Sequence, residues 1–280
     1  MARVLELRLL GRLELRRNGV PVANIQAGKT LALLSYLAVT ARPHTRPALA
    51  GLLWGGMPEA KARGNLSKAL SSLRQVIDDH LTIARQTVAF EPGGDFWLDV
   101  AKFEARVSDN SIEGLQAAVE LYQGDFLDGF YVRNAPEFED WVLAQQARLK
   151  ALALQALHAL AAHFADQGEV GWATAINYTN HLLRLEPWRE EAHRQMMRLL
   201  ALNGQRGAAL AQYKTCRQVL AEELDVEPGP ETVALYEQIR EGELSEGADA
   251  PAPLLPCRSR ICRTFFKYQK RQQMVTGFLL

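Results

Sequence analysis

GNLSKALSSLRQVI, residues 64–77, repeats apolar side chains at helical spacing, so that one side of a helix would be continuously apolar. These residues are Leu66, Ala69, Leu70, Leu73 and Ile77. The opposite side holds Ser, Lys and Gln, and no acidic residue occurs before Asp78, although exposed helices commonly mix both charge signs. Such a face suits an anionic partner. A solvated helix that lacks Asp and Glu explains this stretch equally well, so the neighbouring sequence has to decide.

The residues before this stretch predict a small antiparallel sheet and two helices. Leu5, Leu7 and Leu9 alternate with polar neighbours, and Asn18-Gly19 suits a tight primed turn. A strongly apolar helix is expected over 29–40. A short second helix follows, capped by Thr45, with Pro47 in its first turn.

The third helix is expected to run from Pro58 to about Ile77, and short strands follow it at 81–83 and 88–90. Residues 92–95 predict a turn, and 96–100 a last strand. A sheet, three helices and a β-hairpin in this order are typical of a winged helix-turn-helix, whose last helix lies in the DNA major groove. The third helix is therefore expected to touch double-stranded DNA.

The candidate DNA-binding residues lie on the acid-free face and at the hairpin tip. Lys and Arg can reach guanine or phosphate, Gln can pair with adenine, Ser can bond to either, and Gly leaves room for a backbone. The candidates are Lys61, Arg63, Gly64, Ser67, Lys68, Ser71, Ser72, Arg74, Gln75 and Arg85. Arg85, with Gln86, is expected at the tip, where it can enter the minor groove or touch phosphate; a solvated turn is the alternative.

After Val100 the apolar period becomes 3.6, which predicts helices at about 111–123, 137–166, 170–185, 188–203, 206–223 and 230–241. An internal repeat starts at Gly168 and recurs 36 residues later at Gly204, with matching Gly and Ala positions. The spacing is similar to tetratricopeptide (TPR) helix-turn-helix repeats. The expected fold class is mainly α, a small α+β winged helix followed by an all-α TPR-like array.

Charge is distributed unevenly along the 280 residues. Residues 1–100 hold 13 Lys and Arg against 8 Asp and Glu, residues 101–250 hold 13 against 24, and residues 251–280 hold 6 against none. We therefore expect three parts: a DNA-binding domain over 1–100, a helical domain over 101–245, and a linker with a basic tail over 246–280. The tail is expected to be a disordered end or the remnant of a longer architecture, with a second polyanion contact as the alternative.

No feature of the sequence predicts an enzyme, a cofactor or a metal site. Gly28-Lys29-Thr30 resembles the end of a phosphate loop, but position 23 is Ala where that motif needs Gly, so a helix start is expected. His158 and His163 are five residues apart, a poor spacing for a metal pair. The tryptophans expected in the core are Trp54, Trp141, Trp172 and Trp188.

The location expected from these features of the sequence is inside the cell, in solution. The first twenty residues contain five arginines and no signal peptide pattern, and the longest apolar run, TLALLSYLAV, is too short for a membrane span. The three cysteines lack the paired spacing of a zinc site or a disulfide framework, which fits a reducing compartment.

Several blocks resemble the Streptomyces antibiotic regulatory protein (SARP) family. They are ARGNLSKALSSLRQVI, the junction residues Asp99-Val100 with Phe103, YQGDFLDGF at 122–130, FEDW at 138–141 with Arg148-Leu149, and the segment LEPWREE to LYEQI at 185–239. The resemblance implies an OmpR-like winged helix and a TPR-like bacterial transcriptional activation domain. It also implies binding to promoter direct repeats, protomer contacts on DNA and recruitment of RNA polymerase. The location that it implies is the bacterial cytoplasm, with association to the nucleoid when DNA is bound. Many relatives continue into an ATPase domain.

Two positions depart from the family pattern. Residues 26–30 stand where the family tends to have a basic pair, which puts one phosphate contact in doubt. Asp225 replaces a usual Gly where the helix should end with positive φ. The competing hypothesis is a TPR-like scaffold that binds a peptide or small ligand and keeps only weak, non-specific DNA affinity.

Overall fold

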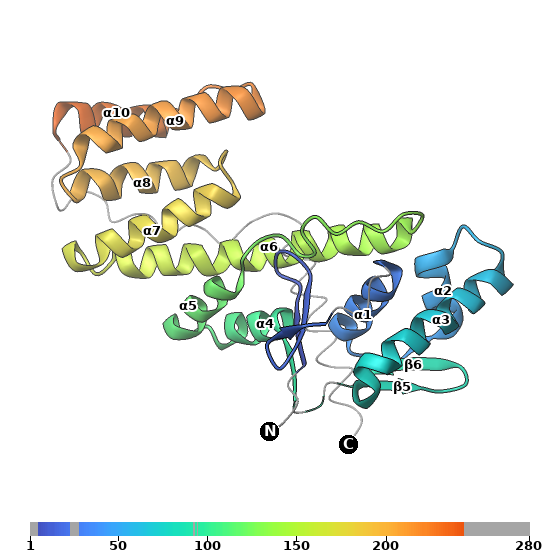
Figure 1. The fold of residues 1–280 in the computed structure, drawn as a ribbon. Helices are drawn as coiled ribbons and strands as arrows, with labels where there is room; N and C mark the ends of the chain where they lie inside the picture. Colours follow the sequence, from blue (N-terminus) through green and yellow to red (C-terminus); the bar gives the residue numbers. More distant parts are fainter. Residues whose placement is uncertain (1–4, 23–27, 92, 94, 244–280) are drawn as a thin grey trace, which may run out of the picture. The chain divides into compact units, whose positions relative to one another are not determined.

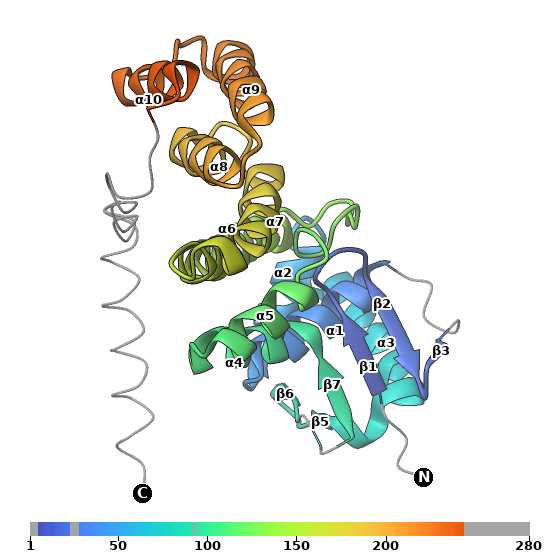
Figure 2. The same ribbon diagram turned by 90° about the vertical axis from the view of Figure 1, so that its left-hand side faces the viewer.

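The computed structural model describes residues 5–22, 28–91, 93 and 95–243. The chain divides after Leu160 into two compact units, which are described separately below (Figures 1 and 2). The expected tail at 246–280 lies outside the described residues. No helix of the described part is both long and apolar enough to cross a bilayer.

The first unit opens with a four-stranded sheet in the order β3-β2-β1-β7. Its strands are β1 Leu5–Arg8, β2 Glu14–Arg17, β3 Val20–Pro21 and β7 Phe96–Leu98. β1 pairs antiparallel with β2 and parallel with β7. Asn18 and Gly19 adopt φ of 51° and 77°, which confirms the primed turn before β3.

Three helices and a wing follow, in the expected order. The helices are α1 Gly28–Thr40, α2 Arg46–Trp54 and α3 Glu59–Ile77. After a 3-10 turn, Asp78–His80, β5 Leu81–Ile83 and β6 Thr87–Phe90 form the wing hairpin, and β6 also pairs with β4 His44–Thr45. The Thr45 hydroxyl accepts from the Ala48 N–H, which confirms the predicted helix cap. The winged helix-turn-helix is therefore confirmed.

The expected strand at 96–100 is wrong in its last two residues. β7 stops at Leu98, and Asp99 and Val100 open an unpredicted helix, α4 Asp99–Asp109. The Asp99 carboxylate, 3% exposed, accepts from the Leu9 and Leu10 N–H groups at 2.6 and 2.7 Å, and from the Val100 N–H at 2.7 Å. The first two bonds span about ninety residues of sequence, so local periodicity could not reveal them. Burial raises the pKa of the Asp99 carboxyl, against the opposing effect of these N–H donors.

The segment 122–130, one of the SARP-like blocks, pairs with the backbone that follows β1. It comes after α5 Ile112–Leu121. The Leu127 N–H donates to the Leu9 carbonyl at 2.8 Å, and the Gly11 N–H to the Asp125 carbonyl at 3.0 Å. A Cβ on Gly124 would lie 3.3 Å from the Gly11 Cα, so glycine permits this close approach.

Trp141 of α6, Pro136–Ala165, lies in an aromatic cluster of the first unit. Its ring centroid is 4.9 Å from Tyr36 of α1, 5.4 Å from Phe126 and 5.5 Å from Phe138. The elements at 99–160 therefore pack directly on the winged helix. The expected domain boundary after residue 100 stays a prediction, and it does not coincide with a boundary between compact units.

The second unit stacks helices in pairs, which confirms the TPR-like array. After the end of α6 come α7 Glu169–Leu185, α8 Glu190–Leu202, α9 Arg206–Leu224 and α10 Pro230–Glu241. Trp172, Ala175 and Leu199 form a core cluster between α7 and α8. Asp225 ends α9 in the left-handed region at φ 54°, as its position predicted.

The two copies of the 36-residue repeat share the sign of φ at their turn glycines, but equivalent residues of their helices differ in burial. Gly168 and Gly204 both have positive φ. A Cβ on Gly171 would come within 1.9 Å of the Phe164 carbonyl oxygen, whereas one on Gly207 would meet nothing within 4 Å. Ala175 is buried but its counterpart Ala211 is exposed. α9 is therefore turned about its axis relative to α7, a tertiary difference that the repeat spacing does not record.

The expectation of four core tryptophans is wrong for one of them. Trp54 and Trp172 are buried, and Trp141 is half-buried inside the aromatic cluster. Trp188 is 41% exposed because it lies before the first turn of α8, in the loop after Pro187, rather than on a helical face.

Asp99→Ala is expected to lower the free energy of unfolding by about 2–4 kcal/mol, because the buried N–H groups of Leu9, Leu10 and Val100 lose their acceptor. Asp99→Asn should cost less, since its amide oxygen can still accept. Urea unfolding of the full chain measures both. The exposed Asp140→Ala should change stability by no more than about 0.5 kcal/mol. Equal effects of Asp99→Ala and Asp140→Ala would contradict the structural role of Asp99.

A fragment of residues 1–100 is expected to melt well below a fragment of residues 1–166, which ends just after α6. The shorter piece lacks the partners of Tyr36, Leu9 and Gly11 described above. Each lost kcal/mol lowers the midpoint of a small domain by about 4–8 °C. Circular dichroism melts compare the two fragments, and coincident midpoints would show that residues 1–100 fold independently.

Candidate nucleic-acid interface

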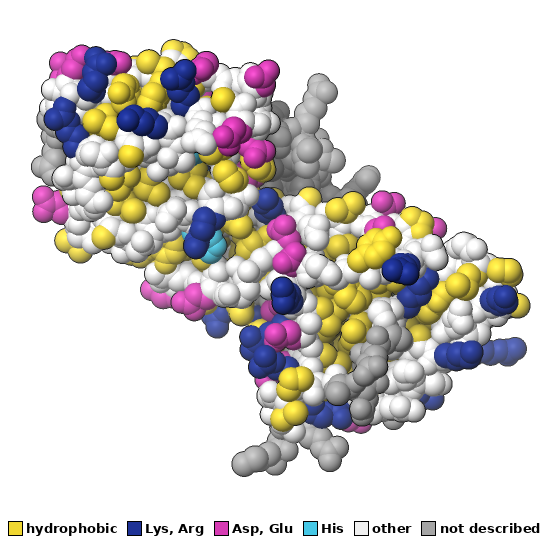
Figure 3. All heavy atoms as spheres, turned by 45° about the horizontal axis from the view of Figure 1, so that its top comes forward, with side chains coloured by type: hydrophobic (Ala, Val, Ile, Leu, Met, Phe, Trp, Pro, Cys, Tyr) yellow, Lys and Arg dark blue, Asp and Glu magenta, His cyan; other side chains and the backbone are white. Residues whose placement is uncertain are grey.

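α3 separates an apolar face from an exposed polar face. The buried side chains are Ala62, Leu66, Ala69, Leu70, Leu73, Val76 and Ile77. All nine candidate residues of this helix are exposed: Lys61, Arg63, Gly64, Ser67, Lys68, Ser71, Ser72, Arg74 and Gln75. The structure thus places them together on a surface open to a partner. On the face drawn in Figure 3, Lys and Arg side chains project from the end of the first unit that holds α2, α3 and the wing.

Arg63 differs from Lys61 and Lys68 of this face because it has an acidic neighbour. α3 begins at Glu59, one turn earlier than the acid-free stretch, and the Glu59 carboxylate lies 2.5 Å from the Arg63 guanidinium. Lys61 and Lys68 form no ion pair with any residue that the structure describes. Their charges are therefore available to phosphate or to base edges.

Two of the serines use their hydroxyl hydrogens inside the helix. Ser67 donates to the Arg63 carbonyl at 3.0 Å and Ser72 to the Lys68 carbonyl at 3.2 Å. The Ser72 oxygen can still accept from a base amino group, whereas the Ser67 oxygen already accepts from the Arg46 guanidinium. Donation to phosphate would require these hydroxyls to rotate.

Arg46 belongs to this surface, although it was not among the residues predicted from the sequence. Its guanidinium donates to the Ser67 hydroxyl at 3.3 Å, and its backbone N–H donates to the Gln86 carbonyl at 2.9 Å. The first residue of α2 thus contacts both α3 and the wing turn. A basic residue directly after the helix cap Thr45 was a usable signal, because a helix N-terminus attracts anions.

The wing turn comprises residues 84–86, between β5 and β6, and Arg85 is exposed there as expected. His44, buried beside the wing in β4, shares a hydrogen bond of 2.7 Å with the Thr40 hydroxyl. Burial, assisted by the charge of Arg42, lowers the pKa of His44. The wing is therefore anchored on α1 by a histidine that favours its neutral form.

Lys29 has a structural role. Its ammonium donates to the Leu53 carbonyl at 2.5 Å and to the Asn134 carbonyl at 3.2 Å, and it lies 5.6 Å from the centroid of the Trp54 ring. Burial lowers its pKa. Gly28 opens α1, which confirms the helix start expected there, while the preceding residues 26 and 27 lie outside the described chain. Lys29 therefore ties α1 to α2 and to the segment before α6.

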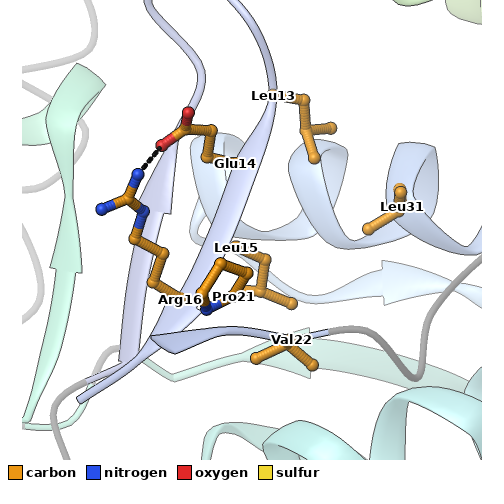
Figure 4. A pocket seen from close by; sticks show the side chains of 7 residues that line it. All are labelled: Leu13, Glu14, Leu15, Arg16, Pro21, Val22 and Leu31. Carbon is orange, nitrogen blue, oxygen red and sulfur yellow. Dashed lines mark ion pairs between the residues drawn. The ribbon is translucent and has the colours of Figure 1, made fainter. Parts of the chain in front are cut away.

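A hollow of about 280 Å³ lies between the N-terminal hairpin and α1 (Figure 4). Aliphatic side chains dominate it, including Leu13, Val22 and Leu31, and its charged groups are Glu14 and Arg16, which pair at 3.0 Å. It offers neither a nucleophile with an adjacent base nor a set of metal ligands. Over the described residues, no cluster of three or more His, Cys, Asp or Glu could hold a metal ion.

Comparison with known proteins adds a family assignment. The family model for the bacterial transcriptional activator domain matches residues 99–240. The transcriptional regulatory protein EmbR of Mycobacterium tuberculosis is 26% identical over 260 residues, covering 84% of this chain and 63% of EmbR. The regulatory protein AfsR of Streptomyces coelicolor is 26% identical over 247 residues, covering 84% of this chain and 24% of AfsR.

One more relative and the protein of one solved structure are also transcriptional regulators by name. The transcriptional regulatory protein MoaR1 of Mycobacterium tuberculosis is 28% identical over 260 residues, covering 85% of this chain and 80% of MoaR1. The solved structure of M. tuberculosis EmbR in complex with a low affinity phosphopeptide matches the fold with a TM-score of 0.62 at 23% identity, covering 87% of this chain and 67% of that one.

The chain thus spans less than two thirds of the length of EmbR, and the activator domain model alone matches half of this chain. The chain belongs to the SARP-type transcriptional regulators, the family defined by the bacterial transcriptional activator domain.

Proposed function

We propose that the chain is a sequence-specific DNA-binding transcription regulator that inserts α3 into the major groove. The acid-free, exposed face of α3 carries this proposal. A helix buried on one side by seven apolar residues needs no particular polar side for stability, so the absence of carboxylates between residues 60 and 77 is best explained by a polyanionic partner.

We assign some residues of this surface to contacts with bases and others to contacts with phosphates. Lys68 and Gln75 project from α3 and suit guanine and adenine edges. Arg46 at the start of α2 and Arg85 at the wing tip lie to either side of α3, and both suit contacts with the phosphate backbone of DNA. Phosphate contacts of this kind fix the register, and the bases of the groove then specify the site.

The helical half is proposed to supply protomer contacts on promoter direct repeats and to recruit RNA polymerase as an activator. These roles follow from membership of the SARP-type family rather than from a contact in the described residues. The acidic balance of residues 101–250 supports a role other than DNA contact for this half.

Selection of bound fragments from a sheared genomic library of the source organism, at about 150 mM salt, tests the proposal. The expected result is a set of fragments that share a directly repeated motif upstream of genes. Recovery of nothing above background would refute sequence-specific binding.

Lys68→Ala is expected to weaken binding to the selected site by about 1–3 kcal/mol if Lys68 reads a base. If Lys68 contacts phosphate only, the loss of affinity should be similar on all sequences. The salt slope, which is the slope of the logarithm of the binding constant against the logarithm of the salt concentration, should then fall in magnitude by about one unit. Fluorescence anisotropy on the selected and a scrambled duplex separates the two cases. The control is Lys102→Ala, an exposed lysine on α4. Unchanged binding to both duplexes would remove Lys68 from the interface.

Arg46→Ala is expected to weaken binding to selected and scrambled duplexes alike and to reduce the salt slope by about one unit, as for a lost phosphate contact. Arg46→Lys keeps the charge and should retain most of the affinity. Ser67→Ala removes the partner hydroxyl and tests whether Arg46 acts through Ser67. A loss confined to the selected duplex would instead assign Arg46 to base recognition.

A second candidate is the TPR-like scaffold with only weak, non-specific DNA affinity. The bonds of Lys29 to Leu53 and Asn134 favour it, because they withdraw the cation nearest the family's basic pair from DNA. This function predicts that residues 101–245 capture a protein or small-molecule partner, while the genomic selection yields no shared motif.

A further inference from the structure

A second hollow, of about 180 Å³, lies in the helical unit between α7 and α9. Its walls combine two kinds of side chain. Leu183 of α7 and Val219 of α9 are aliphatic, while Asn180, Arg184, Gln212 and Thr215 offer polar groups. Pockets for drug-sized ligands measure about 300–1,000 Å³, so this hollow suits a ligand of only a few heavy atoms.

The floor of the hollow is fixed by His193 of α8, which is 2% exposed. Its Nε2 lies 2.7 Å from the Pro187 carbonyl oxygen, and its Nδ1 lies 2.7 Å from the Gln212 side-chain nitrogen. Nε2 therefore carries the proton and donates to the carbonyl, while Nδ1 accepts from Gln212. These bonds hold α8, α9 and the loop before α8 in one arrangement, so the walls are set before any ligand arrives.

Arg184 gives the hollow an uncompensated positive charge. It is exposed, and it forms no ion pair with any residue in the described chain. None of the lining residues is Asp or Glu, although the helical half as a whole is acidic. Glu186, the nearest acid along the chain, pairs with Arg189 at 2.8 Å. Burial, and then the charge of Arg184, lowers the pKa of the neighbouring His181.

We infer that this hollow binds a short aliphatic carboxylate. The carboxylate would accept hydrogen bonds from the Arg184 guanidinium and from the Asn180 amide, and its carbon chain would lie against Leu183 and Val219. A guanidinium can bond both oxygens of a carboxylate at once, which makes this cation selective for planar anions. A neutral ligand would give the Arg184 guanidinium no opposite charge to pair with, and a long ligand would not fit in the hollow.

The site goes beyond the proposed DNA recognition and does not depend on it. Every residue that builds it belongs to the second unit, whereas α3 and the wing belong to the first. Failure of the genomic selection would leave this inference standing, and failure of the ligand test would leave the DNA proposal standing.

Two-dimensional amide NMR of the full chain, titrated with sodium hexanoate against a sodium chloride series of equal ionic strength, tests the inference. Saturable shifts confined to α7, α9 and the start of α8 are expected, with a dissociation constant no higher than about 1 mM. Hexanamide, which has the same chain without the charge, should give no saturable shift. No saturation by about 10 mM hexanoate would overturn the site.

Two variants and one control locate the binding. Arg184→Gln should raise the dissociation constant about tenfold or more, equivalent to about 1.4 kcal/mol. Thr215→Phe, at an exposed position of the wall, should block binding by filling the hollow. Lys214→Gln removes an adjacent exposed charge that does not line the hollow, and it should change affinity less than twofold, about 0.4 kcal/mol.

The remaining outcomes all contradict the inference. Equal weakening by Arg184→Gln and Lys214→Gln would reveal general charge attraction to the surface. Inorganic phosphate that binds as tightly as hexanoate would show a site for any anion rather than for an aliphatic carboxylate. Hexanamide that binds as tightly would show a purely apolar site.

Discussion

The Asp99 carboxylate and the N–H groups of Leu9 and Leu10 make the contact on which the first unit depends. One side chain closes the end of β1, ends β7 and starts α4. A buried carboxylate is stable only when its oxygens are bonded, and here one oxygen takes two backbone donors while the other takes a third. Because β1 and β7 are neighbours in the sheet, this contact fixes the point at which the chain leaves the winged helix.

The packing around this junction explains why the winged helix is not a separate compact body. The segment at 122–130 extends the pairing beyond β1, Trp141 packs on Tyr36, and Lys29 reaches the carbonyl of Asn134. α1 therefore has partners on both sides. It packs against α3 within the winged helix and against α6 outside it, so the position of the candidate DNA-reading helix is fixed by residues well beyond 100.

The sequence predicted those features that depend on neighbours along the chain. The Asn18-Gly19 turn, the Thr45 cap, the bounds of α3 and the left-handed Asp225 are all local, and all were confirmed. α4 was missed because Phe96 to Val100 has the composition of a strand, and only the distant amides of Leu9 and Leu10 turn Asp99 into a helix start. Arg46 offered a local signal, its place directly after the helix cap Thr45, but its contacts with Ser67 and Gln86 exist only once α2, α3 and the wing are assembled.

Comparison of Lys29 with Arg46 shows that the burial of a cation and its existing hydrogen bonds determine whether it can contact a phosphate. Lys29 lies against the Trp54 ring and donates to two carbonyls, and moving it to a phosphate would leave those carbonyls without their donor. Arg46 bonds a hydroxyl with one edge of its guanidinium and keeps further N–H groups for another acceptor. If a phosphate contact is missing at the start of α1, the start of α2 can therefore replace it. The absence of a basic pair before α1 thus argues for a shifted backbone contact at least as strongly as for lost DNA affinity.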